Sequence, residues 1–231
     1  MMNDDQNALA SFQGTARLFP LPNVVLFPHV VQPLHIFEPR YKQMAAEALA
    51  ADRLVTPVLL RPGWEDQYDA RPPLHPVACL GRVVAEQKLP DGRYNLLVRG
   101  LSRLQIRSEV ADSRPYRTAR AELLTDGPLP TLPAAKILRK QLADKVLPRF
   151  AAGAPRDQLT ELFRGELPLG ALCDILGFAL PFPVEHKQAL LELLDVTHRT
   201  GRLLTLLDAL VPSTPVEVDP DRKFPDRKSV V

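Results

Sequence analysis

The sequence predicts an α+β protein in which a small β-barrel with one early helix precedes a C-terminal helical bundle. Up to about residue 124, apolar residues occur in short runs separated by Pro, Gly and Asp, a pattern typical of short strands joined by tight turns. Beyond residue 125 they recur every three to four positions, as in amphipathic helices. The linker-like stretch TDGPLPTLP (125–133) separates the two patterns.

The barrel is expected to start from Arg17–Met44 (RLFPLPNVVLFPHVVQPLHIFEPRYKQM), where prolines interrupt the apolar sequence. Proline fixes its own φ and lacks an N–H, so bent extended segments are favoured over a long helix. The apolar runs are Leu18–Leu21, Val24–Phe27 and Val30–Phe37. Pro39 then suits the first position of a helix, and apolar residues continue from Tyr41 at i, i+3, i+4 spacing.

Five more strands complete the prediction of about seven short strands in a partly closed barrel. They are expected at residues 54–60, 77–86, 94–100, 101–107 and 116–124. Pro57 marks the first of them as an edge strand or a bent one. Leu89–Gly92 (LPDG) signals a hairpin, and Gly100 permits a bulge or a corner.

The second half of the chain carries leucine stripes that predict a helical core. Helices are expected at residues 134–146, 158–164, 169–180, 183–194 and 196–210. Asp195 directly precedes the last of these helices and is expected to cap it by accepting a backbone N–H bond.

These patterns divide the chain into four parts: a flexible leader (1–14), a barrel subdomain (15–126), a helical-bundle subdomain (127–212) and a disordered tail (213–231). The leader lacks a secretory signal, and no apolar run approaches the roughly 20 residues that span a bilayer. We therefore expect a cytoplasmic protein without membrane contact. Cys79 and Cys173 fit a reduced compartment, although the sequence leaves open whether they meet.

The motif search predicts no catalytic residue, cofactor or metal site. P-loop, GxGxxG, HExxH and GxSxG sequences are absent. A Ser–Lys dyad is not excluded by spacing, but no serine falls in a convincing strand-to-helix turn.

Five residues are candidates for a peptide-binding surface: His35, Phe37, Trp64, Tyr68 and Arg99. For His35, a hydrogen-bonded structural role is favoured over that of a ligand or base. Trp64 and Tyr68 lie in a proline-rich loop (61–76) whose length suggests function, while the alternative for Trp64 is to cap the barrel end. Arg99 either pairs within the barrel or faces a groove.

Other charged residues receive structural interpretations. Glu38 and Arg40 flank a helix start, where the helix dipole favours a carboxylate. For basic residues that alternate with apolar strand positions, a solvated face is favoured over an RNA-binding one; these are Arg82, Arg93, Arg103 and Arg107. The formal net charge of +2 likewise argues against nucleic acid.

The chain also resembles a known family. The segments LFPLPNVVLFP, PLHIFEPRYKQM, VACLGRVV, DGRYNLLVRGLSRLQI, PYRTARAEL and LPFPVEHKQALLELLDVTHRTGRLLTLL closely resemble the N-terminal, substrate-binding domain of Lon-type ATP-dependent proteases. The resemblance covers roughly residues 15–210. It implies a PUA-like pseudobarrel followed by a helical bundle. In full-length Lon proteases this domain helps to recognise unfolded or tagged substrates and supports assembly, while the ATPase and Ser–Lys peptidase domains lie downstream.

We therefore expect a stand-alone, non-enzymatic module, since the sequence stops before an ATPase or peptidase domain could begin. Its expected partners are unfolded or extended polypeptide, and a protease or chaperone; its oligomeric state is not predicted. Extended peptide would add to an exposed sheet edge, with side-chain pockets giving selectivity. The alternative is RNA binding through the PUA-like barrel, which requires a clustered basic face. A third alternative, a cryptic hydrolase, requires a polar cleft that the sequence does not reveal.

Overall fold

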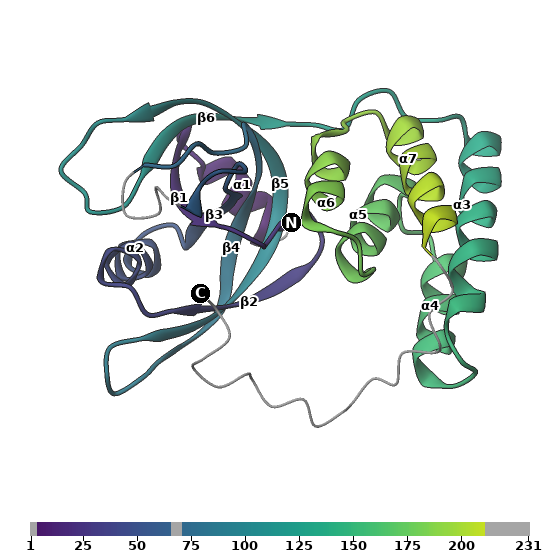
Figure 1. The fold of residues 1–231 in the computed structure, drawn as a ribbon, viewed down its shortest axis with the longest axis horizontal. Coiled ribbons are helices and arrows are strands. Elements are labelled where there is room, and N and C mark those ends of the chain that lie inside the picture. The colour runs from purple at the N-terminus through teal and green to yellow at the C-terminus, as the bar shows by residue number, and fades with distance from the viewer. Residues whose placement is uncertain (1–3, 66–70, 211–231) are drawn as a thin grey trace.

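The computed structural model describes residues 4–65 and 71–210 and confirms the predicted α+β class, with a β-barrel followed by a helical bundle (Figure 1). The elements in chain order are α1 (Asp4–Ser11), β1 (Thr15–Leu21), β2 (Val31–Ile36), α2 (Pro39–Ala50), β3 (Leu54–Leu59), β4 (Val77–Lys88), β5 (Tyr94–Val110), β6 (Thr118–Leu124), α3 (Leu132–Val146), α4 (Ala154–Arg164), α5 (Leu169–Ala179), α6 (Val184–Glu192) and α7 (Val196–Ala209). Tyr68 and the predicted tail (213–231) lie outside the described residues.

The six strands form one sheet in the order β2-β5-β4-β3-β1-β6, and β5 pairs again with β6. This second pairing closes β5, β4, β3, β1 and β6 into a ring. β1 and β3 run parallel, and the other pairings are antiparallel. β2 lies outside the ring and pairs with the first half of β5, so it forms an edge of the sheet.

The structure merges two predicted strands, 94–100 and 101–107, into the single strand β5. The predicted bulge is present, because Leu80 and Gly81 of β4 pair with Ser102 and Gly100 and leave Leu101 as an extra residue. The bulge changes the register without ending the strand. The prediction of separate strands was wrong because hydrogen bonding to β4 continues on both sides of the bulge.

The apolar run Val24–Phe27 was also expected to be extended, and it forms no strand in the structure. Its last three residues are instead buried in the core. The Phe27 carbonyl oxygen approaches Gly100 so closely that a Cβ there would lie 1.9 Å from it. The His29 N–H then donates to the Gly100 carbonyl oxygen at 2.9 Å. This segment therefore packs against β5 with its own backbone.

The strand containing Pro57 was predicted to be either an edge strand or a bent one, and the prediction of an edge strand is wrong. β3 lies inside the ring, between β4 and β1. β4 pairs with β3 at Leu54 and Val55, whereas β1 pairs with it from Thr56 to Leu59. The pairing partner of β3 thus changes from β4 to β1 just before Pro57. Proline has no backbone N–H, so one hydrogen bond between strands is missing there.

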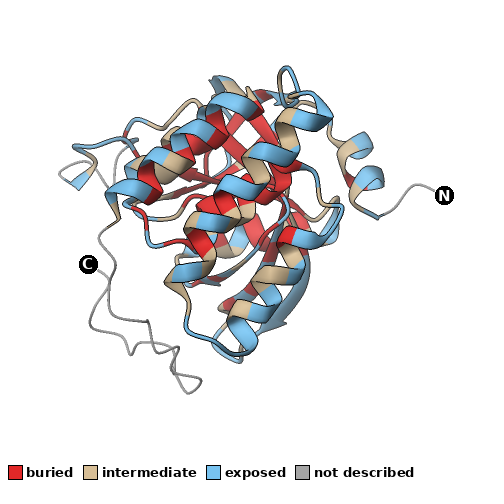
Figure 2. Cartoon of the chain, turned by 90° about the vertical axis from the view of Figure 1, so that its right-hand side faces the viewer, coloured by how far each residue is buried: buried red, intermediate tan, exposed pale blue. Residues whose placement is uncertain are grey.

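Helix α1 (Asp4–Ser11) occupies part of the segment predicted to be a flexible leader, and the flexibility itself stays a prediction. Ala8 is buried, and Leu9 and Phe12 pack against the cluster that fills the barrel interior. Figures 1 and 2 together show α1 at one mouth of the barrel. The interior cluster is made of small and branched residues from the five ring strands: Ala16, Leu18, Leu54, Val58, Ala78, Leu80, Leu104, Ala119 and Ala121.

The larger hydrophobic cluster lies outside the barrel and joins both halves of the chain. It includes residues of α2, the segment after β1, and the inner faces of the bundle helices. Figure 2 shows these helices with buried residues inward and exposed residues outward. Pro39 begins α2 as expected, and the Asp195 carboxylate accepts the His198 N–H at 2.9 Å as the predicted cap of α7. The division at residue 126 stays a prediction.

Cys79 and Cys173 are both buried and are free thiols. Burial raises the pKa of the Cys173 thiol to about 11, which keeps it protonated at neutral pH. Within residues 4–65 and 71–210, no helix is long and apolar enough to cross a bilayer.

Candidate functional site

One face of the sheet continues past the closed ring as an exposed surface. Along the first half of β5, the even-numbered residues from Tyr94 to Gly100 are buried and the odd-numbered residues from Asn95 to Arg99 are exposed. The exposed residues lie on the side of the sheet that lines the barrel interior farther along, where Leu104 belongs to the interior cluster. The barrel lining thus opens into a surface that solvent reaches.

We call this surface the open sheet face. Its three cross-strand rows, written in the order β2, β5, β4, are Val31–Arg99–Arg82, Pro33–Leu97–Ala85 and His35–Asn95–Gln87. The middle row is apolar, and Val84 is the extra residue of a bulge beside it. Val31, Val84 and Leu97 are 38%, 39% and 42% exposed. Clustered exposed apolar side chains of this kind mark interaction surfaces more often than isolated ones do.

The polar end of the open sheet face is a hydrogen-bonded cluster around His35. Its Nδ1 lies 2.7 Å from Asn95 Oδ1, and its Nε2 lies 3.4 Å from Arg93 Nη1. The imidazole ring stacks on the ring of Phe37, with centroids 6.1 Å apart and an interplanar angle of 25°. Phe37 is 60% exposed, so this stacking holds a large apolar side chain in solvent beside the end of β2.

The opposite end of the open sheet face is basic and is contacted by helix α1. Arg82 and Arg99 are cross-strand partners in one row. Arg82 Nη1 lies 3.6 Å from an Asp4 oxygen, and Arg99 Nη1 lies 3.4 Å from an Asp5 oxygen. Arg99 thus faces the open sheet face, and its pairing partner Asp5 belongs to α1 rather than to a barrel strand.

The edge strand β2 borders the open sheet face on one side. Among the described residues, β5 is the strand that pairs with β2, and the other edge of β2 is unpaired. Pro33 lies in the middle of β2 and is tolerated there because an edge strand can lack one ladder donor. An unpaired edge beside an apolar face can accept an additional extended chain.

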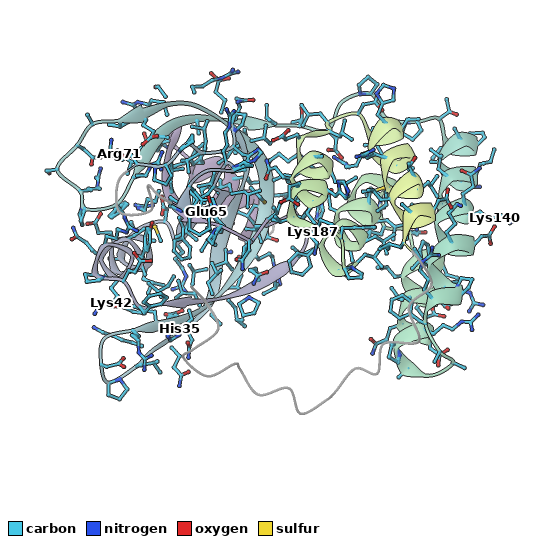
Figure 3. All side chains as sticks on the ribbon, in the orientation of Figure 1. His35, Lys42, Glu65, Arg71, Lys140 and Lys187 are labelled. Atoms are coloured by element: carbon cyan, nitrogen blue, oxygen red, sulfur yellow. The ribbon has the colours of Figure 1, made fainter. Side chains whose placement is uncertain are left out.

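Trp64 does not join His35, Phe37 and Arg99 on this surface. It is partly buried in the loop after β3, and that loop is fastened to the barrel elsewhere. The Arg61 N–H donates to the Pro73 oxygen at 2.9 Å, and Arg117 Nη1 donates to the Pro72 oxygen at 2.7 Å. Figure 3 shows Glu65, the neighbour of Trp64, apart from His35. The roles of all five candidate residues in binding stay predictions.

Arg103 corrects the interpretation of the strand arginines as a solvated face, because its side chain is only 3% exposed. It crosses from β5 to the bundle, where Nη2 and Nη1 bind the two Asp174 oxygens at 2.5 and 2.9 Å. Arg103 Nε also donates to the Leu191 oxygen at 2.8 Å. Arg199 lies on the other side of the same carboxylate, with Nε at 3.6 Å, and forms a bidentate pair with Asp126.

The four strand arginines considered from the sequence give no support to the RNA-binding alternative. Each of the four arginines considered from the sequence has a carboxylate partner: Arg82 pairs with Asp4, Arg93 with Asp91, Arg103 with Asp174 and Arg107 with Glu122. In the described part of the chain, no three His, Cys, Asp or Glu side chains come together as metal ligands would.

Comparison with known protein families matches residues 15–209 to the ATP-dependent protease La (LON) substrate-binding domain. The chain belongs to this family. Lon protease 2 of Herpetosiphon aurantiacus is 31% identical over 214 residues, which cover 89% of this chain and 26% of that protein. The Lon protease of Escherichia coli K12 is 25% identical over 201 residues, 87% of this chain and 25% of that protein. The chain thus spans about a quarter of the length of these relatives.

Solved LON substrate-binding domains share the fold. A Lon N-terminal domain protein from Xanthomonas campestris has a TM-score of 0.60 at 19% identity, with 83% of this chain and 97% of that one covered. The N-terminal domain of Lon protease from the Mycobacterium avium complex has a TM-score of 0.64 at 17% identity, with 84% and 98% covered. Helix α1 precedes the matched region, which begins where β1 begins.

Part of the open sheet face could be predicted from the sequence pattern. Alternation in YNLLVRG places Asn95, Leu97 and Arg99 on one side of a strand, yet it does not say which side is covered. Val84 carries no such signal, because its exposure depends on a bulge in β4. Arg82 becomes part of the surface through the register between β4 and β5, which a single strand sequence does not encode.

Proposed function

We propose that this LON substrate-binding domain binds extended polypeptide on the open sheet face and along the free edge of β2. The observation that carries the proposal is the juxtaposition of Val31, Leu97 and Val84, exposed and apolar, with an unpaired strand edge. An added strand would form main-chain hydrogen bonds with β2, and its alternate side chains would extend the rows that begin with Val31, Pro33 and His35. Family membership supports a polypeptide ligand.

We further propose that the chain is not an enzyme and acts in the cytoplasm. The match of residues 15–209 to a substrate-binding domain supports the first of these proposals. We also propose that a protease or a chaperone is the protein partner of this domain.

The decisive experiment measures fluorescence anisotropy of a dye-labelled, reduced and alkylated protein that cannot refold, titrated with the purified chain. Leu97→Asp places a charge at the centre of the apolar row and is expected to weaken binding about tenfold or more. Ile137→Asp is the matched control, since Ile137 is a 60% exposed apolar residue on α3. Absence of saturable binding by the unmodified chain, or an equal effect of both substitutions, would refute this assignment.

A further inference from the structure

Helix α1 and the arginine row of the open sheet face together indicate what kind of polypeptide the site selects. We infer that the site prefers an extended segment in which an acidic residue lies next to apolar residues, and that Asp4 and Asp5 of α1 compete with that acidic residue for Arg82 and Arg99. This inference rests on the proposed function and adds both a charge preference and an intramolecular competitor.

The spacing of the rows gives the charge preference. Arg99 and Leu97 are two residues apart on the same face of β5, which corresponds to about 7 Å along a strand. Arg82 stands beside Arg99, so two guanidinium groups border the apolar row on one side. An added strand with an apolar side chain in the row of Pro33 and Leu97 therefore places the side chain two positions away in the row of Val31, Arg99 and Arg82. A carboxylate at that position would be favoured.

The chain itself supplies carboxylates to this position. Asp4 and Asp5 lie in the first turn of α1 and pair with Arg82 and Arg99 at 3.6 and 3.4 Å. Both contacts are long for ion pairs, and the Asp4 side chain is 86% exposed. Exposed pairs of this kind contribute little to stability and are easily exchanged for another carboxylate.

The anchoring of α1 allows its first turn to leave without opening the barrel. An eight-residue helix is too short to be stable alone, so its order depends on docking. The apolar contacts come from its second half, through Ala8 and Leu9, and from Phe12 beyond it. The aspartates therefore occupy the opposite end of α1 from these apolar contacts. The helix also lies before the region matched to the family, residues 15–209.

The test compares two dye-labelled peptides of identical apolar sequence, one with two aspartates beside the apolar residues and one with two asparagines, by anisotropy at low salt. The unmodified chain is expected to bind the acidic peptide more tightly. The double substitution Asp4→Asn and Asp5→Asn removes the competitor and should tighten acidic-peptide binding about three- to fivefold. Binding of the neutral peptide should not change.

The reciprocal variant, Arg82→Gln with Arg99→Gln, is expected to abolish the difference in affinity between the two peptides. Added salt should reduce the preference in the unmodified chain. Circular dichroism of each variant verifies that the fold is retained. If both peptides bind equally well to the unmodified chain and to the Asp→Asn variant, the charge preference and the competition are refuted while polypeptide binding stands. If neither peptide binds, the proposed function fails as well.

Discussion

The Arg103 guanidinium group and the Asp174 carboxylate form a buried bidentate pair across the junction of barrel and bundle. The two N–O distances are 2.5 and 2.9 Å, and the side chains are 3% and 1% exposed. Arg199 Nε lies 3.6 Å from Asp174 on the bundle side. Asp174 is thus the buried bidentate partner of Arg103, whereas Arg199 forms its own bidentate pair with Asp126.

Asp174→Asn is accordingly expected to destabilise the chain by about 3–5 kcal/mol, because it removes the charged bidentate partner of the buried Arg103 guanidinium. Arg103→Met should cost less, since Arg199 remains to pair with the carboxylate. Urea unfolding followed by circular dichroism measures both. Arg107→Gln, at the exposed pair with Glu122, is the control and should change the unfolding free energy by less than about 1 kcal/mol. Equal effects at all three sites would contradict this account.

Gly100→Ala is expected to be severely destabilising, whereas Gly201→Ala should be neutral or stabilising. A Cβ at Gly100 would lie 1.9 Å from the Phe27 carbonyl oxygen, and a backbone atom in a packed core cannot move aside cheaply. A Cβ at Gly201 meets nothing within 4 Å, and alanine favours helix α7 by about 1 kcal/mol over glycine. Thermal melts of the two variants give shifts in opposite directions if the packing is as described.

Stability above pH 10 is expected to depend on Tyr116. Burial, together with the hydrogen bond to Glu47, raises the pKa of Tyr116 to about 12. The unfolded chain ionises this phenol near pH 10 while the folded chain does not, so stability is lost as the pH rises from about 10 to about 12. Tyr116→Phe should flatten the pH dependence of the unfolding free energy in that window. Glu47→Gln should flatten it partly, because burial remains; an unchanged slope in both variants would rule out the phenol as the cause.

Ala8→Asp is expected to release α1 from the mouth of the barrel, because it would place a carboxylate in an apolar cluster. Hydrogen exchange at the amides of α1 should accelerate, while that of the ring strands changes far less. Ala10→Asp on the exposed side of the same helix is the control and should leave exchange unchanged. Slow exchange of α1 in the Ala8 variant would mean that the helix is held by other contacts.

The sequence predicted the elements more reliably than their partners. Proline punctuation located β1, β2 and the start of α2, and leucine spacing located the bundle helices, since both effects act within a few residues. The continuity of β5 and the burial of Val25–Phe27 depend on contacts with residues far away in the sequence. Gly100 allowed a bulge, as expected, but pairing with β4 decided that the strand continues through it.

Less of the candidate site than of the secondary structure could be predicted from the sequence. His35, Phe37 and Arg99 were chosen individually, and the structure places them on one surface because β2 pairs with β5. Trp64 was chosen because it is an unusual residue in a long loop, a criterion that carries no information about location. Helix α1 could not be anticipated, since DDQNALAS has weak helical amphipathicity and gains its order from the barrel interior.

Because β5 is continuous, it fixes the position of the open sheet face relative to the helical bundle. Arg99 belongs to the open sheet face, and Arg103, four residues later on the same strand, is locked to the bundle. The two positions are about 13 Å apart along the backbone. A polypeptide bound to the open sheet face would therefore have a fixed orientation relative to the bundle, because one continuous strand connects the two. A partner protein that binds the bundle would meet the bound polypeptide at a distance and angle that β5 determines.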